Sequence, residues 1–141
     1  MSNNLFGDNN VKYDLIRQNY PKECLSYIEK KSDGKNTLDI GCGTGGFLHS
    51  LSQKISFKSC LGVDVSNKAI GLTQKYGTQY QQILPGDFSV AKEKSLLFFM
   101  DVLEHIDDDI GFLKGMMEAL PVGGQVLITV PGMPTLFSNW D

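Results

Sequence analysis

The stretch TLDIGCGTGGF, from Thr37 to Phe47, decides the fold class. Its first half is a short apolar run typical of a buried strand, and its second half holds four glycines within six residues. Phe47, Leu48 and Leu51 then recur at helical spacing, which predicts a helix over residues 47–54. A strand that turns through glycines into a helix is typical of the first unit of an open α/β sheet.

The alternation of strand and helix continues along the chain. Further strands are predicted over residues 59–65, 80–84, 95–100 and 125–130, with helices over 66–76 and from 107–109 to 120. The strands are continuously apolar, which indicates a parallel sheet with helices on both faces. Right-handed crossovers then give a Rossmann-like, doubly wound and mainly parallel α/β fold.

Residues 1–36 are expected to form a separate N-terminal helical segment, before the core at residues 37–141. Residues 1–10 are polar and are expected to form a loose leader. They lack the basic and apolar regions of a secretory signal. Pro21 interrupts the apolar pattern that follows, so we expect a short helix, a break and a second helix.

Composition limits the partners and the compartment. The 141 residues carry 13 Lys and Arg against 16 Asp and Glu, a net charge of −3, with no basic run. Nucleic acid and anionic membranes are therefore not expected as partners, because both require clustered cations. Three cysteines without a C-x-x-C pair predict neither a disulfide framework nor a zinc site, and favour the reducing cytoplasm.

The glycine-rich turn is a candidate cofactor loop. Gly41, Gly43 and Gly46 satisfy G-x-G-x-x-G, a pattern that by itself is weak. Glycines permit positive φ and let a ligand approach the backbone, although a simple tight turn needs them too. The ligand is expected to be either a dinucleotide or S-adenosylmethionine (SAM).

Asp39 favours SAM over a dinucleotide. It stands two residues before Gly41 inside an apolar strand, where a carboxylate costs desolvation unless it meets a cation or several N–H donors. The ammonium group of a bound methionine moiety, or the N–H groups of the loop, would supply that partner. A pyrophosphate at the same place would be repelled.

Two further carboxylates follow strands. Asp64 ends the second strand, where it can accept from both ribose hydroxyls of either cofactor, or alternatively cap the next helix. Asp87 follows the third strand and can accept from an adenine amino group while Phe88 covers the ring. The other interpretation of this pair is a turn Asp beside a core Phe.

Taken together, these stretches resemble the class I SAM-dependent methyltransferases. The matching segments are LDIGCGTGGF (Leu38–Phe47), GVDVS (Gly62–Ser66), GDF (Gly86–Phe88), DVLEHIDD (Asp101–Asp108) and LPVGGQVLITVP (Leu120–Pro131). The resemblance implies that the glycine loop wraps the methionine end of SAM, and that the acids after the second and third strands hold the ribose and the adenine. The expected cofactor-binding residues are Asp39, Gly41, Gly43, Asp64, Val65, Asp87, Phe88 and Asp101.

The last segment, PGMPTLFSNWD (Pro131–Asp141), resembles bacterial small-molecule and glycan-locus methyltransferases. The expected reaction is methyl transfer to a nucleophile on a small molecule or sugar. That family adds a helix and two strands after the fifth strand, so the resemblance implies a truncated core. A SAM-binding module without catalysis and a nicotinamide-dependent oxidoreductase remain alternatives, and the apolar strand 125–130 is expected to promote self-association as a sheet edge.

Asp101, Glu104 and His105 follow the fourth strand, at the edge of the sheet where ligands bind. Asp101 can accept from SAM, and His105 is the predicted catalytic residue, a general base that takes a proton from the attacking group. Resemblance to ubiquinone-pathway O-methyltransferases suggests instead a divalent cation at an acid-x-x-Glu-His arrangement. A third interpretation is that Glu104 and His105 only begin the next helix. No metal site is predicted.

Overall fold

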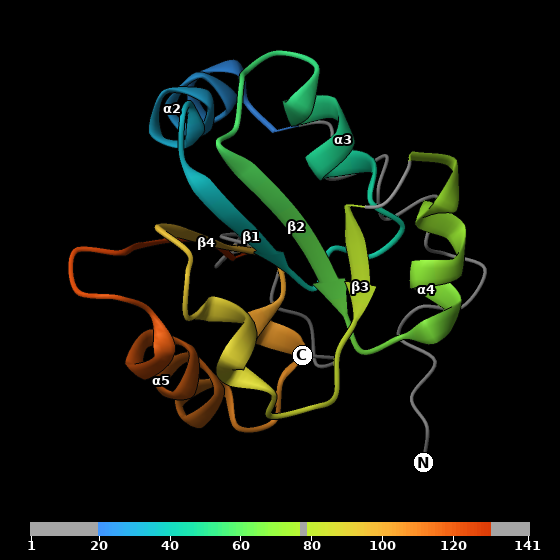
Figure 1. The fold of residues 1–141 in the computed structure, drawn as a ribbon, viewed down its shortest axis with the longest axis vertical. Coiled ribbons are helices and arrows are strands. Elements are labelled where there is room, and N and C mark those ends of the chain that lie inside the picture. Colours follow the sequence, from blue (N-terminus) through green and yellow to red (C-terminus); the bar gives the residue numbers. More distant parts are fainter. Residues whose placement is uncertain (1–19, 77–78, 131–141) are drawn as a thin grey trace, which may run out of the picture.

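The computed structural model describes residues 20–76 and 79–130, and it contains one parallel five-stranded sheet (Figure 1). The strands are β1 (Asn36–Ile40), β2 (Ser59–Asp64), β3 (Tyr80–Gln82), β4 (Leu96–Met100) and β5 (Gln125–Thr129). Their order is β3-β2-β1-β4-β5. The predicted doubly wound α/β fold is therefore confirmed. The strand order reverses between β1 and β4, where folds of this type form a ligand crevice at the carboxyl ends of the strands.

The described residues also form four helices and three short 3₁₀ turns. They are α2 (Lys22–Ser32), α3 (Gly46–Ser52), α4 (Asn67–Leu72), α5 (Asp109–Ala119), η1 (Thr73–Tyr76), η2 (Phe88–Ala91) and η3 (Leu103–His105). Helix α2 begins directly after Pro21, as predicted. The helix expected before Pro21 and the leader lie outside the described residues, apart from Tyr20. None of the described helices is long and apolar enough to cross a membrane.

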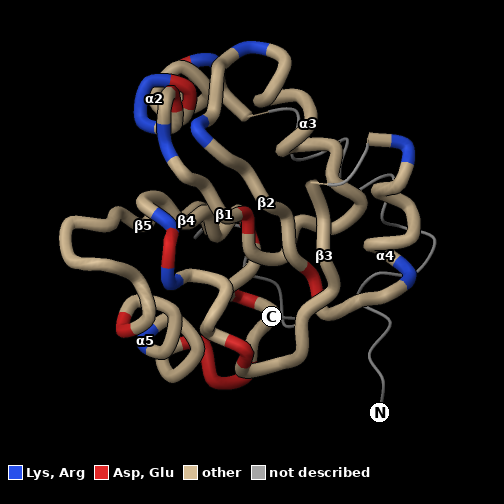
Figure 2. The backbone as a smooth tube through the Cα atoms, in the orientation of Figure 1, with Lys and Arg blue, Asp and Glu red and all other residues tan. Residues whose placement is uncertain are grey.

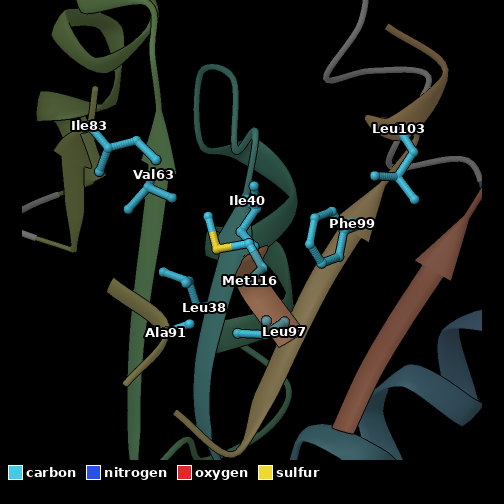
Figure 3. Close-up of a cluster of buried hydrophobic side chains, with 9 residues drawn as sticks. All are labelled: Leu38, Ile40, Val63, Ile83, Ala91, Leu97, Phe99, Leu103 and Met116. Carbon is cyan, nitrogen blue, oxygen red and sulfur yellow. The ribbon is translucent and has the colours of Figure 1, made fainter. Parts of the chain in front are cut away.

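The sheet carries an apolar core on each face. On one face a cluster joins the sheet to α5 and η2 (Figure 3), and on the other a second cluster joins it to α2 and α3. Successive residues of β4 alternate between the two clusters, and all five are buried. A strand buried on both faces needs apolar residues at every position, which explains the continuous run in the sequence. The first cluster consists of Leu38, Ile40, Val63, Ile83, Ala91, Leu97, Phe99, Leu103 and Met116.

Several boundaries differ from the prediction. The helix expected over residues 66–76 is α-helical only to Leu72 and continues as η1. Its N-cap is Ser66, whose hydroxyl accepts a hydrogen bond from the Ala69 N–H at 3.2 Å. The strand expected over residues 80–84 ends at Gln82, although the Ile83 N–H still donates to the Asp64 carbonyl at 3.0 Å.

The segment between β4 and α5 contains little helix, and α5 begins within the predicted range of residues 107–109. Only the single turn η3 forms within residues 101–106. Helix α5 then begins at Asp109, where the Asp108 carboxylate accepts a hydrogen bond from the Gly111 N–H at 3.0 Å. This cap satisfies a backbone donor that has no partner within the helix.

Candidate functional site

The glycine loop, residues 41–46, joins β1 to α3 at the carboxyl edge of the sheet. Three of its glycines have positive φ: 70° at Gly41, 58° at Gly43 and 86° at Gly45. Residues with a Cβ adopt this region at a cost, so glycine is favoured at each position. The loop differs from the sequence pattern in one respect, because the third positive φ falls on Gly45 and not on Gly46, which begins α3.

The chain's own side chains fill the space that two of these glycines leave. A Cβ on Gly41 would lie 2.7 Å from Cγ2 of Val102, and a Cβ on Gly45 would lie 2.7 Å from Cε1 of Tyr80. Both distances are shorter than a real Cβ contact. At Gly41 and Gly45, therefore, internal packing is one reason for glycine, in addition to any close approach by a ligand.

Asp64 ties the loop to the end of β2. Its Oδ2 accepts a hydrogen bond from the Gly43 N–H at 3.0 Å, and its Oδ1 accepts from the Ser66 N–H at 2.8 Å. The residue is only 3% exposed. Each carboxylate oxygen has a second lone pair, so these bonds are compatible with the ribose contact predicted for Asp64, which stays a prediction.

Asp39 lies beneath the loop with no exposed surface. Its register partner in β2 is Gly62, whose partner in β3 is Tyr80, so the three residues form one row across the sheet. Burial is the main cause that raises the pKa of the Tyr80 hydroxyl above its ordinary value, and the charge of Asp39 adds to it. The contact predicted between Asp39 and a cofactor ammonium group stays a prediction.

Asp87 and Phe88 lie where β3 leads into η2. The Asp87 Oδ1 accepts from the N–H and the hydroxyl of Ser89, at 3.2 and 2.5 Å. The Phe88 ring packs on Gly115 of α5 and lies edge-on to Phe112, with centroids 5.7 Å apart. This is the arrangement of a turn Asp beside a core Phe, and the adenine contacts remain predictions.

Val65 is the apolar side chain that stays accessible next to Asp64. It is 47% exposed, although it directly follows a strand whose last three residues are buried. An accessible apolar side chain beside a candidate ribose site suits a contact with a ligand, and the cofactor contact expected for Val65 stays a prediction.

Asp101 is the most constrained residue of the site. Among residues 20–76 and 79–130 it is the one non-glycine residue with positive φ, at 54°. Such a conformation costs about 1–3 kcal/mol and persists only where the surroundings fix it. Here the Asp101 N–H donates to the Thr129 carbonyl at 3.1 Å, the Thr129 hydroxyl donates to Oδ1 at 3.0 Å, and the Tyr20 hydroxyl donates to Oδ2 at 2.5 Å.

Tyr20 and Thr129 were not identified from the sequence. Tyr20 comes from the segment before α2, and its ring lies edge-on to Phe47 of α3 at 6.1 Å between centroids. It therefore links the beginning of α3, directly after the glycine loop, to the end of β4. The two residues lie 81 and 28 positions from Asp101, and no local pattern marks such a contact.

Glu104 and His105 belong to η3 and are exposed. The His105 Nε2 lies 3.7 Å from the Glu104 Oε1. The carboxylate of Asp101 accepts hydrogen bonds from the Tyr20 and Thr129 hydroxyls. Within the described part of the chain, no three His, Cys, Asp or Glu side chains are grouped as a metal site would require.

The carboxyl edge of the sheet is acidic. Figure 2 shows acidic segments gathered along this rim, while the described lysines lie on helices and in connecting loops. Asp64, Asp87 and Asp101 each stand at the end of a strand or shortly after it. SAM carries a sulfonium and an ammonium group and no phosphate, so the charges of this rim fit it. A pyrophosphate would be repelled.

Comparisons with known proteins agree with this chemistry. The model of the methyltransferase domain family matches residues 13–141. Ubiquinone biosynthesis O-methyltransferases from Aromatoleum aromaticum and Aeromonas salmonicida are 30% and 28% identical to the chain over 115 and 116 residues. Each match covers 74% of this chain and 48% of the relative, so the chain spans about half the length of these curated relatives.

Solved structures share the fold. Streptomyces venezuelae DesVI is 21% identical, with a TM-score of 0.65, and the match covers 94% of this chain and 61% of that one. The plantazolicin methyltransferase BpumL, solved in complex with a monoazolic desmethylPZN analog and SAH, is also 21% identical. Its TM-score is 0.66, and the match covers 85% of this chain and 49% of that one.

Proposed function

This chain belongs to the class I SAM-dependent methyltransferases, and on that premise we propose that it transfers a methyl group from SAM to a nucleophile on a small molecule or sugar. The observation that carries the proposal is the acidic carboxyl edge around the glycine loop, which suits a cationic cofactor. A nicotinamide-dependent oxidoreductase, the alternative left open by the glycine pattern, has no support from the family match.

We assign the cofactor contacts by position along this edge. The glycine loop, with Gly41 and Gly43, receives the methionine end. Asp64 receives the ribose hydroxyls, with Val65 against the base, and Asp87 receives the adenine amino group. The buried charge of Asp39 favours a cation above the loop. The bonds of Asp64 to the Gly43 and Ser66 N–H groups support this assignment, because they fix its carboxylate in one orientation.

Asp101 is assigned to the charged end of the cofactor and not to proton removal. Both of its oxygens already accept a hydroxyl hydrogen, one from Tyr20 and one from Thr129. These two hydrogen bonds hold the carboxylate in one orientation, and a carboxylate attracts a nearby cation. A fixed anion at the end of β4 therefore helps to hold the cofactor in line with the attacking group.

His105 is the proposed general base. The bound cofactor supplies a methyl group on an activated sulfonium, so the protein has to position the nucleophile and accept its proton. His105 stands one turn after Asp101 with an exposed imidazole, and imidazole can accept a proton near neutral pH. Glu104, 3.7 Å away, can orient the ring.

A SAM-binding role without independent catalysis is the second candidate. It is the alternative that the sequence left open, and the chain spans about half the length of its curated relatives. Turnover separates the two functions, because a binding module would hold SAM and methylate no acceptor.

The test begins with isothermal titration of SAM, its product S-adenosylhomocysteine (SAH) and NAD. We expect SAM and SAH to bind and NAD to give no signal, whereas binding of NAD alone would contradict the proposal. Turnover is then measured with hydroxyl acceptors first, because the curated relatives are named O-methyltransferases. A cytoplasmic location is part of the proposal, supported by three free cysteines.

A further inference from the structure

Tyr80, the first residue of β3, lies across the glycine loop. Its hydroxyl donates a hydrogen bond to the Gly45 carbonyl at 2.8 Å, 35 residues away in the sequence. We propose that Tyr80 is a positioning residue, which holds the glycine loop in the shape that receives the methionine end of the cofactor. This inference rests on the proposed function.

The space for the Tyr80 ring is provided by two glycines from different elements. A Cβ on Gly45 would lie 2.7 Å from Cε1 of the ring, and a Cβ on Gly62 of β2 would lie 2.6 Å from Cδ1. Any side chain at either position would displace the ring. The third glycine of the loop with positive φ therefore makes room for Tyr80, and the ring in turn limits the movement of the loop.

The hydrogen bond acts on the peptide that joins the loop to α3. The Gly45 carbonyl accepts from the Tyr80 hydroxyl and also from the His49 N–H at 3.0 Å. Two donors on one carbonyl fix the plane of this peptide group. Because the peptide is planar and trans, fixing its carbonyl also fixes the direction of the Gly46 N–H.

The Tyr80 ring also packs near a second aromatic ring, that of Tyr76. Tyr76 of η1 lies 6.2 Å from Tyr80 between ring centroids, and it stacks on His49 of α3 at 4.3 Å. Tyr80 is thus enclosed between β2, the loop and a ring that packs on the loop's own helix. Burial raises the pKa of the hydroxyl above its ordinary value, so Tyr80 remains protonated at neutral pH and able to donate.

The decisive variant is Tyr80→Phe, which keeps the ring and removes only the hydroxyl. Affinity for SAH is measured by isothermal titration at a temperature well below the unfolding midpoints of both proteins. We expect the Kd to rise about five- to tenfold, the loss typical of one neutral hydrogen bond. With an acceptor available, the KM for SAM should rise while kcat stays within about twofold.

Tyr76→Phe is the matched control, because it removes a hydroxyl from the neighbouring ring of the same cluster. Its Kd for SAH should stay within about twofold of the original. If Tyr80→Phe lowers the unfolding midpoint while its Kd for SAH stays within about twofold of that of the original chain, Tyr80 is only structural and the inference is wrong. Should the variant be partly unfolded, trimethylamine N-oxide in both samples restores the folded state for the same comparison.

The two proposals fail in different ways. If the original chain binds neither SAM nor SAH, the proposed function is wrong and the role of Tyr80 falls with it. If the original chain binds SAH and Tyr80→Phe binds it equally well, only the role of Tyr80 is wrong.

Discussion

Asp64 combines a structural and a proposed binding role in one carboxylate. It connects the Gly43 N–H of the loop with the Ser66 N–H that follows β2. Removing it leaves the buried Gly43 N–H and the part-buried Ser66 N–H without their acceptor, and an unsatisfied buried donor costs about 1–3 kcal/mol. A substitution at Asp64 must therefore be examined for stability and for binding separately.

We expect Asp64→Ala to lower the free energy of unfolding by about 2 kcal/mol. Its affinity for SAH should fall at least about tenfold, because the ribose hydroxyls lose a charged acceptor. Asp64→Asn keeps one acceptor oxygen, so its free energy of unfolding and its affinity for SAH should both fall less than in Asp64→Ala. Urea unfolding and isothermal titration measure the two effects, and an unchanged SAH affinity in Asp64→Ala would exclude the ribose assignment.

The glycine loop shows, at the scale of the element, how packing and conformation act together. Gly41 has a φ of 70°, and the Val102 side chain occupies the space beside it. Val102 follows β4, so this contact joins the loop to the strand on the other side of β1. The loop is therefore held by Val102 on one side and by Tyr80 on the other.

Gly41→Ala should destabilise the chain for both reasons. The left-handed conformation costs about 1–2 kcal/mol for a residue with a Cβ, and the contact with Val102 adds to it. A second substitution, Val102→Ala, should recover the packing part in the double variant but not the conformational part. Thermal unfolding of the single and double variants tests this. Equal stability of Gly41→Ala and the original chain would show that the loop has room at this position.

For the whole molecule, the main open question is what covers the edge of the sheet at β5, the last strand in the order β3-β2-β1-β4-β5 of the described residues. Within residues 20–76 and 79–130, β5 pairs only with β4, and the side chains of Ile128 and Val130 are 42% and 58% exposed. An apolar strand with one unpaired edge is a template for pairing with another chain.

We propose that this 141-residue chain self-associates through β5. Sedimentation velocity should show an average mass that rises with concentration. Ile128→Lys places a charge on the strand and should shift the distribution toward monomer. The exposed Val122, before β5, provides a matched control as Val122→Lys, which should leave the association unchanged. A strictly monomeric chain at high concentration would contradict the proposal.

The sequence by itself determined the strand and helix order, the start of α5 among residues 107–109, and the positions of Asp64, Asp87 and Asp101 at strand ends. These features depend on residues close together in the chain, where apolar periodicity and side chain-to-backbone bonds act. The shortened β3 and the 3₁₀ turns were not predicted, since the exposure of a sheet edge is not visible in local periodicity.

Only the tertiary structure decided which side chains support the site. Tyr80 meets Gly45 across 35 residues, and Tyr20 meets Asp101 across 81. Such contacts arise because separate segments pack against one sheet edge, and no spacing along the chain encodes them. The sequence therefore indicated where a cofactor would lie, whereas packing decided how its loop and its carboxylates are held.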